Sequence, residues 1–194
     1  MMKKAIVTGA GGFIGSALTK KLLQNNVAVI GIDVSEKTLE KFKHYDNFSM
    51  IIADFSKYDK LHEIIKDEEI DVFYHFAWQG VFGDAFKDYH LQLSNAKYAC
   101  DAFAEAAKMK VKKFVFAGTM NEYEMNTYIA KDEFRPRYTY IYSAVKQVSE
   151  AICKTLSFNS DTAFCAGRIA MAFGENNKSR MLPNVVMKNL LDGV

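Results

Sequence analysis

Short apolar runs alternate with amphipathic stretches along almost the whole of this 194-residue chain. Apolar runs of strand length predict six buried β-strands at residues 3–8, 27–33, 48–53, 70–77, 113–118 and 162–168. Apolar residues at helical spacing predict helices at 13–24, 36–43, 57–66, 88–110 and 140–158, with a further helix near 181–191. Strands that alternate with helices are typical of an α/β fold, a doubly wound parallel sheet with crossover helices.

The connections that follow the strands are the places where such a sheet binds ligands. We expect a loop at 78–83 and a longer, tyrosine-rich loop at 119–138. Ligands of open parallel sheets bind beyond the carboxyl ends of the strands. The residues that fall at these ends are Gly9, Asp33, Asp54, Ala77 and Thr119.

A glycine-rich turn separates the first predicted strand from the first predicted helix. It comprises Gly9, Gly11, Gly12, Phe13, Ile14 and Gly15. Free N–H groups and the helix dipole make the start of such a helix an anion site, here for the phosphates of a dinucleotide. Gly9 would allow the tight turn, Gly12 the approach of a pyrophosphate, and Gly15 close packing of the helix on the strand. The spacing is Gly-x-x-Gly-x-x-Gly rather than the commoner Gly-x-Gly-x-x-Gly, so a plain βα turn is the alternative.

Asp33 ends the second predicted strand, about 20 residues after the glycine turn, where a ribose-binding carboxylate is expected. A carboxylate accepts hydrogen bonds from both ribose hydroxyls and repels a 2′-phosphate. This favours NAD over NADP, and Lys37 is the only cation close by. The alternative is that Asp33 simply caps the next helix, because Asp is a common N-cap residue.

Tyr142 and Lys146 lie four residues apart, on one face of the helix predicted at 140–158. A free phenol has a pKa of about 10, and a neighbouring ammonium lowers that value. A cationic nicotinamide ring nearby would supply the rest of the shift toward neutral pH. A phenol tuned in this way can take a hydroxyl proton while hydride leaves the same carbon atom. Tyr and Lys at this spacing are also common on amphipathic helices, so the pair gains its meaning from the glycine turn.

Composition and charge exclude several other classes of protein. Hydrophobic residues make up 49% of the chain, and 25 Lys and Arg nearly balance 23 Asp and Glu. No basic stripe favours nucleic acid, and no apolar run reaches the ~20 residues of a membrane span. The chain shows no signal-peptide pattern. Its three cysteines have no metal-like spacing and are expected to stay reduced in a cytoplasm.

In this order and spacing, the residues resemble the extended short-chain dehydrogenase/reductases, within the NAD-dependent epimerase/dehydratase family that acts on nucleotide sugars. The matching positions are Thr8 to Gly15, Asp33, Asp54, Phe55, His75 to Ala77, Asn95, Thr119, Tyr142, Lys146, Arg168 and Gly174. The resemblance therefore covers nearly the whole chain. It implies a Rossmann-like NAD-binding domain at 1–168 and, at 169–194, the start of a C-terminal substrate region that is largely missing or minimal.

The resemblance also implies a role for each matched residue. The cofactor-binding set would be Gly9, Gly12, Phe13, Ile14 and Gly15 at the pyrophosphate, Asp33 at the adenine ribose, Asp54 and Phe55 at the adenine, and Ala77 and Lys146 at the nicotinamide-side ribose. Tyr142 would be the general base or acid, Lys146 its electrostatic tuner and Thr119 the residue that orients the reacting oxygen. The structural alternatives are a helix cap for Asp54, strand packing for Ala77 and a loop-capping hydroxyl for Thr119.

Departures from the family pattern narrow the expected reaction. Dehydratases of the family carry acidic residues directly after the catalytic threonine, where this chain has Met120 and Asn121, and Glu122 and Glu124 are out of register. This favours a nucleotide-sugar epimerase or keto-reductase over a dehydratase. Met171 stands where the family often has an asparagine that touches the sugar diphosphate.

Two further possibilities follow from the resemblance. The first is that the chain is a non-catalytic NAD(H)-binding sensor or scaffold, which a shortened C-terminus favours and the retained Thr119, Tyr142 and Lys146 disfavour. The second is a homodimer through the long fourth and fifth helices, expected only by analogy. The other expected partner is the nucleotide-sugar substrate.

Overall fold

The computed structural model describes residues 1–66, 69–131, 137, 139–174 and 182–193. Six strands form a single sheet in the order β3-β2-β1-β4-β5-β6, and every neighbouring pair is parallel. The strands are β1 (Lys4–Thr8), β2 (Ala28–Asp33), β3 (Phe48–Ile52), β4 (Val72–His75), β5 (Lys113–Thr119) and β6 (Ala163–Ile169). The predicted α/β class, the parallel sheet and the six strand positions are confirmed.

The strand order reverses direction at β1, whose neighbours are β2 on one side and β4 on the other. Thr8 pairs with Ile32 of β2 and with His75 of β4, so the three strands end together. Because no crossover covers the gap between the ends of β1 and β4, this is the switch point where a doubly wound sheet opens a crevice.

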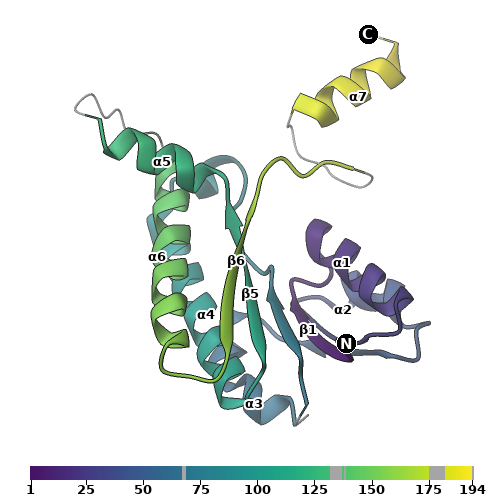
Figure 1. Ribbon diagram of the computed structural model, residues 1–194. Coiled ribbons are helices and arrows are strands. Elements are labelled where there is room, and N and C mark those ends of the chain that lie inside the picture. The colour runs from purple at the N-terminus through teal and green to yellow at the C-terminus, as the bar shows by residue number, and fades with distance from the viewer. Residues whose placement is uncertain (67–68, 132–136, 138, 175–181, 194) are drawn as a thin grey trace.

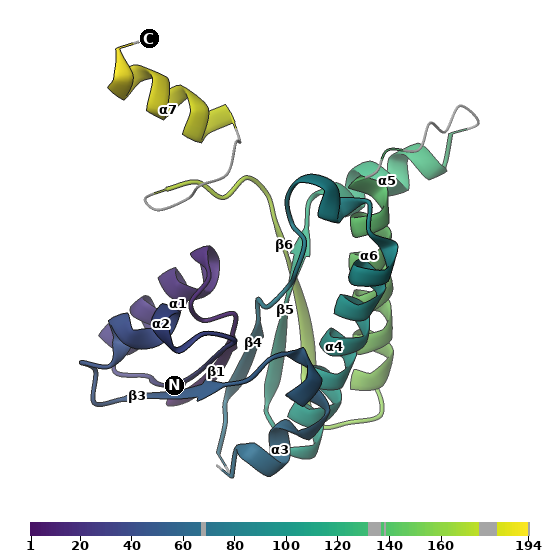
Figure 2. The same cartoon turned by 180° about the vertical axis from the view of Figure 1, so that it is seen from behind.

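Helices cover both faces of the sheet (Figures 1 and 2). One face carries α1 (Phe13–Gln24) and α2 (Glu36–Leu39), which continues as the 3-10 helix η1 (Glu40–Phe42). The other face carries α3 (Leu61–Ile64), α4 (Tyr89–Lys108) and α6 (Thr139–Ser157). The 3-10 helix η2 (Phe55–Lys60) leads into α3 and also packs on α4.

Each face has its own hydrophobic core. Leu22 and Leu23 of α1 pack with Val7, Leu39 and Phe42 on one side of the sheet. On the other side the core is larger and aromatic, and it includes Tyr58, Phe73, Phe103, Phe114 and Phe116. Burial on both faces explains why the central strands are apolar without alternation.

One predicted element is wrong. The tyrosine-rich stretch predicted as a loop at 119–138 contains a helix, α5 (Asn121–Ile129); residues 132–136 and 138 lie outside the described residues. The α5 sequence has no glycine or proline, and it places Glu122 and Glu124 in the first turn, where negative charge suits the helix dipole. The loop predicted at 78–83 runs into a 3-10 helix, η3 (Gly83–Phe86).

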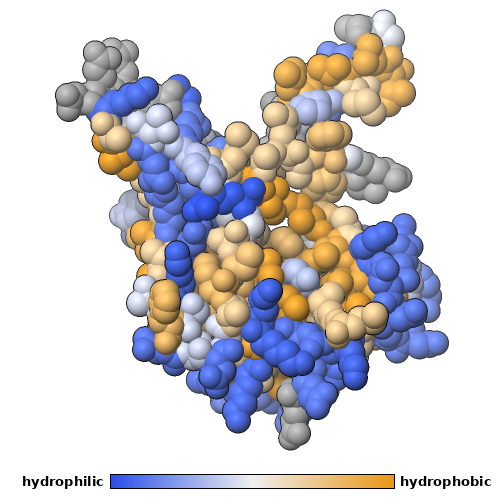
Figure 3. Space-filling view, viewed as in Figure 1, coloured by the Kyte–Doolittle hydropathy of each residue, from blue (hydrophilic) through white to orange (hydrophobic). Residues whose placement is uncertain are grey.

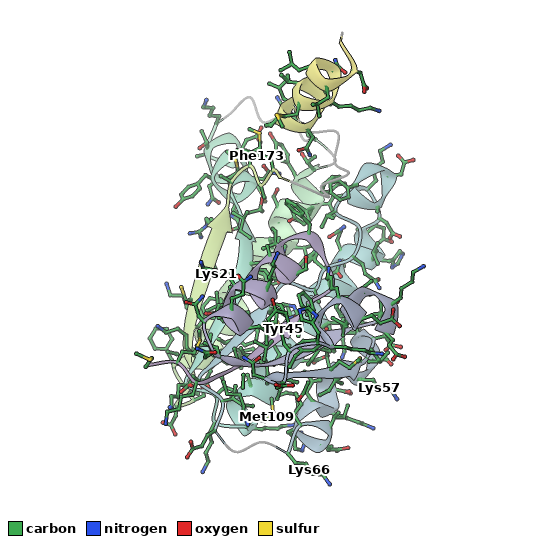
Figure 4. All side chains as sticks on the ribbon, turned by 90° about the vertical axis from the view of Figure 1, so that its right-hand side faces the viewer. Lys21, Tyr45, Lys57, Lys66, Met109 and Phe173 are labelled. Atoms are coloured by element: carbon green, nitrogen blue, oxygen red, sulfur yellow. The ribbon has the colours of Figure 1, made fainter. Side chains whose placement is uncertain are left out.

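The predicted last helix is present as α7 (Leu182–Asp192), while Met181 lies outside the described residues. Hydrophobic side chains cover α7 in Figure 3, and its Leu182, Leu190 and Leu191 are all more than two thirds exposed. Figure 4 shows Phe173, on the segment that leads toward α7, beyond one end of the sheet, with Met109 at the opposite end. The C-terminal segment therefore extends from the edge where the strands end.

Candidate functional site at the switch point

In the glycine turn between β1 and α1, backbone packing leaves no room for a side chain at Gly9 or Gly15. Gly9 has φ +66°, and a Cβ atom there would lie 2.9 Å from the backbone nitrogen of Ala77. The Gly12 N–H donates to the Gly9 carbonyl oxygen at 3.0 Å. A Cβ atom on Gly15 would overlap that same carbonyl oxygen. The turn thus needs glycine at 9 for its conformation and at 15 for helix packing.

The N-terminus of α1 is open toward the crevice. Among the described residues, no side chain caps the helix at Gly12, and its first turn contains no acidic residue. Phe13, Ile14 and Gly15, which form that first turn, line the cavity described below. Backbone N–H groups at an uncapped N-terminus attract negative charge, so this end of α1 is suited to a phosphate group.

The Asp33 carboxylate bonds the glycine turn. One of its oxygens accepts the Gly11 N–H at 2.8 Å, and the other accepts the Val34 N–H at 2.9 Å. The residue at the N-cap of α2 is Ser35, so Asp33 is not the helix cap that was the alternative. The carboxylate is held at the end of β2, beside the turn that leads into α1.

Three other predicted cofactor residues have structural contacts. Asp54 accepts the Ser56 N–H at 2.7 Å and caps η2, and its bonds to Ser56 lower the pKa of this carboxyl. Phe55 is buried and stacks on Tyr98 with 4.9 Å between ring centroids. The Ala77 N–H points at the Thr8 hydroxyl oxygen at 3.4 Å. A cap for Asp54 and packing for Ala77 are therefore roles that these residues fill in the fold.

Tyr142 projects from the first turns of α6 into an aromatic and polar surround. Its ring lies edge to face with Trp78 and Phe86, at centroid distances of 6.0 and 5.2 Å. Its side chain faces that of Thr119, which is almost fully buried at the end of β5. The structure therefore brings together two of the three predicted catalytic residues directly.

Lys146 lies one turn further along α6 and is 3% exposed. Its ammonium donates to the Ala117 carbonyl oxygen at 2.8 Å and sits over the Trp78 ring, 3.5 Å from the centroid. The same ammonium lies 5.8 Å from the centroid of the Tyr142 ring. Burial lowers the pKa of Lys146 to about 7, while the nearby Glu122 carboxylate opposes this shift.

The pKa of Tyr142 shifts in the direction opposite to the expected one. The Tyr–Lys spacing predicted a phenol with a lowered pKa, but burial raises the pKa of Tyr142 to about 12. The hydrogen bond from Thr119 works against this rise, and the charge of Glu122 adds to it. Desolvation of the phenolate outweighs the neighbouring hydrogen bond, so Tyr142 holds its proton at neutral pH.

A cavity of about 570 Å³ joins the two halves of the site. Its lining includes Gly9, Gly12, Phe13, Ile14 and Gly15 from the glycine turn, and Thr119, Tyr142 and Lys146 from the opposite wall. Asp33, Asp54, Phe55 and Ala77 are not in the lining. The structure therefore brings the candidates for phosphate binding and for proton transfer together in one cavity, whereas these four predicted cofactor residues lie outside its lining.

Sequence reasoning missed the aromatic wall of this cavity and the contacts that fix it. Trp78 and Phe86 flank Tyr142, and Gln92 of α4 accepts the Trp78 indole N–H at 2.9 Å. Gln92 also donates to the carbonyl oxygens of Gly80 and Ala85, at 2.8 and 3.0 Å. The one usable signal was that Trp78, the single tryptophan of the chain, directly follows a predicted strand.

We expect the buried Lys146 ammonium to destabilise the folded state, and the substitution Lys146→Met to remove this destabilisation. The folded state lowers the lysine pKa from its ordinary 10.5 to about 7, so the unfolded chain binds more protons between these values. The stability of the wild type should therefore rise as pH increases from about 7 toward 10.5. Lys146→Met should be more stable than the wild type at and below pH 7, by an amount on the order of a few kcal/mol. Chemical denaturation across this pH range measures the difference.

The matched control is Lys154→Met, the same substitution at an exposed position on the same helix. It should leave the stability close to that of the wild type at every pH. A stability gap between wild type and Lys146→Met that stayed constant with pH would contradict the prediction.

A doubly wound parallel sheet with an open glycine turn at its switch point defines a Rossmann-like domain. The family model described as "NAD dependent epimerase/dehydratase family" matches residues 5–193. The chain belongs to this family. The resemblance stated from the sequence motifs is thereby confirmed.

Curated relatives align over most of the chain. An uncharacterized protein of Methanocaldococcus jannaschii, MJ1055, is 30% identical over 205 residues, which cover 98% of this chain and 63% of the relative. The UDP-N-acetyl-alpha-D-glucosaminuronate decarboxylase of Bacillus cytotoxicus is 31% identical, over 80% of this chain and 48% of the relative. The chain thus spans less than two thirds of the length of these relatives.

Solved structures share the fold. A UDP-glucuronic acid 4-epimerase from Bacillus cereus in complex with NAD superposes with a TM-score of 0.74 at 24% identity, covering 97% of this chain and 63% of the other. A UDP-galactose 4-epimerase superposes with a TM-score of 0.76 at 22% identity, with the same coverage. Within the part of our chain that the structure describes, none of the helices has the length and hydrophobicity to cross a membrane.

Proposed function

We propose that this chain binds NAD at the glycine turn and takes part in an NAD-dependent epimerisation or keto-reduction of a nucleotide sugar. The observation that carries the proposal is the shared cavity, which joins the open N-terminus of α1 to Thr119, Tyr142 and Lys146. Family membership and relatives named as acting on UDP-sugars support the substrate class.

The residues of the site fit a dinucleotide. Because glycines stand in the Gly9–Gly15 turn, backbone rather than side chains borders this part of the cavity. Phe13 and Ile14, at the start of α1, line the same cavity. Asp33 offers a carboxylate to a ribose and disfavours a 2′-phosphate by like charge. Asp54 and Ala77 would complete the binding surface at the ends of β3 and β4. Bound NAD would supply a hydride acceptor in its oxidised form and a hydride donor in its reduced form.

Tyr142 would transfer the proton that accompanies hydride movement. With a pKa of about 12 it is a phenol at neutral pH, ready to donate to a carbonyl oxygen that becomes a hydroxyl. In the opposite direction it must accept a proton, which requires more positive charge near the phenol than Lys146 alone supplies. Thr119, which lines the cavity beside Tyr142, would orient the reacting oxygen.

The geometry of α5 disfavours the dehydratase alternative. Elimination of water needs an acid that can reach the leaving hydroxyl, and Asn121 is the residue of the α5 start that lines the cavity. Glu122, the nearest carboxyl in sequence, is fully buried, with one oxygen on the Thr119 N–H and the other on Arg168. It is therefore committed to the fold rather than to a leaving group.

The same proposal divides the chain by role. Residues 1–168 would form the dinucleotide-binding part, and residues 169–194 would begin the substrate-binding part. Ile169, Ala170 and Ala172, just after β6, already line the cavity, which supports this division.

The test is to titrate the chain with NAD and NADP by calorimetry, then to mix it with NADH and a keto-sugar nucleotide. We expect binding of NAD to be tighter than binding of NADP, because Asp33 repels the extra phosphate. Steady loss of NADH absorbance would identify a reductase, and interconversion of sugar epimers without net NADH consumption would identify an epimerase. No detectable affinity for NAD would overturn the proposal.

A further inference from the structure

Glu122 is a fully buried carboxylate three residues after Thr119, in the first turn of α5. One of its oxygens accepts the backbone N–H of Thr119 at 2.8 Å. The other accepts the Nε–H of Arg168 at 2.8 Å. A carboxylate removed from water is costly unless its oxygens are bonded, and here both are bonded by groups that lie close to the cavity.

Arg168 extends this contact to two more elements. Its position is on β6, next to β5 in the sheet, where Gly118 pairs with Arg168. A terminal guanidinium nitrogen of Arg168 donates to both carboxylate oxygens of Glu150 on α6, at 2.9 and 3.0 Å. The carboxylate–guanidinium–carboxylate chain therefore joins α5, β6 and α6 around the end of β5.

Two further contacts fix the position of Glu122. The Gln147 amide of α6 donates to the Glu122 backbone carbonyl oxygen at 3.1 Å. A Cβ atom on Gly118 would lie 3.1 Å from a Glu122 carboxylate oxygen and 3.3 Å from the Arg168 Cγ atom. The pair thus packs directly over the glycine that precedes Thr119, so a shift of Glu122 would move the end of β5.

We propose that Glu122 is a positioning residue for the reaction: it holds the Thr119 backbone, through the N–H bond and the Arg168 contact, so that the Thr119 hydroxyl meets Tyr142. This inference rests on the proposed function and deepens it. Glu122 touches neither cavity nor reacting atoms, and it acts only through Thr119. Its role therefore differs from that of the acid in a dehydratase, which must reach the substrate.

The charge of Glu122 also affects the pKa of groups in the cavity, which gives a second way to test the positioning role. The charged and titratable groups around it are Arg168 on β6 and Tyr142, Lys146 and Glu150 on α6. The Glu122 carboxylate raises the pKa of Tyr142 and also that of Lys146. Removal of this charge should therefore let Tyr142 lose its proton at lower pH.

The decisive variant is Glu122→Gln, which keeps the size of the side chain. Its amide oxygen can replace only one of the two acceptors, and its NH₂ group would face a donor. We expect kcat to fall by about tenfold or more, because small misplacements of a catalytic group are costly. KM and the affinity for NAD should hardly change, and the pH–rate profile should move to lower pH. In NMR spectra, the Thr119 amide resonance should shift and its hydrogen exchange should accelerate.

The matched control is Glu124→Gln, on the same helix, whose carboxylate pairs with Arg137 near the surface. It should leave kcat and the Thr119 amide unchanged. Should Glu122→Gln fail to fold, Arg168→Lys provides a second variant, because lysine keeps the charge but cannot bond Glu122 and Glu150 together in the same geometry. It should show a smaller loss of kcat in the same direction.

The two ideas fail in different ways. A wild-type protein that neither binds NAD nor turns over a nucleotide sugar would overturn the proposed function, and the positioning role with it. An active wild type whose Glu122→Gln variant keeps full kcat, or keeps an unshifted Thr119 amide, would overturn the positioning role alone.

Discussion

Tyr142→Phe is expected to lower turnover by about 10² to 10⁴-fold, the range that a lost general acid–base group typically costs. The change removes one hydroxyl and keeps the ring, so the edge-to-face contacts with Trp78 and Phe86 should persist. The glycine turn is untouched, and the affinity for NAD should stay within about twofold of the wild type, well under the ~1.4 kcal/mol that corresponds to tenfold. Steady-state kinetics and calorimetry on the same preparation measure both quantities.

Tyr140→Phe is the matched control, because it makes the same change on the same helix at a residue that does not line the cavity. It should leave turnover nearly intact. If Tyr142→Phe kept full activity, Tyr142 would not be the proton-transfer group. If neither variant nor wild type turned over any nucleotide sugar while all bound NAD, the sensor alternative would gain support.

Gly15→Ala is expected to damage both the fold and the cofactor site. The added methyl group would overlap the carbonyl oxygen of Gly9, which is backbone and cannot rotate away. Either α1 must move off β1 or the turn must open, and overpacking of this kind typically costs about 1–3 kcal/mol. Because the same movement displaces the start of α1, NAD affinity should fall by about tenfold or more. Denaturant titration and calorimetry check the two effects.

Gly167→Ala is the control for this substitution. Gly167 lies on β6, and a Cβ atom there would meet nothing closer than the Phe116 carbonyl oxygen at 4.0 Å. Its effect on stability should be small, since alanine loses less conformational entropy on folding than glycine. Equal losses of stability in the two variants would argue against close packing as the reason for Gly15.

Most of the fold was predictable because its signals are local. Each strand is a short apolar run, and each long helix carries an apolar stripe. The type and the order of the elements therefore follow from the spacing of apolar residues along the chain. The helix α5 was missed because its polar, tyrosine-rich sequence has no apolar stripe at helical spacing. In its first turn, Glu122 accepts a hydrogen bond from Arg168, 46 residues further along the chain. No local sequence pattern predicts that this glutamate is buried.

The candidate site was predictable as far as its residue types and spacings went. Most of the glycine turn lines one cavity with Tyr142 and Lys146, as their positions at a strand end and on one helix face suggested. The electrostatics were not predictable, because they depend on burial. Lys146 is enclosed by Trp78 and Phe116, and desolvation there moves its pKa in the opposite direction from a surface lysine with an acidic partner.

The single tryptophan of the chain is an intrinsic fluorescence probe of the site. Trp78 lies against the Lys146 ammonium and edge-on to Tyr142, so its intrinsic fluorescence originates within the cavity that we describe. Emission excited selectively from tryptophan therefore carries no background from elsewhere in the chain. A ligand that displaces the ammonium or screens the indole should change this emission directly, so occupancy of the cavity can be followed without attaching a label.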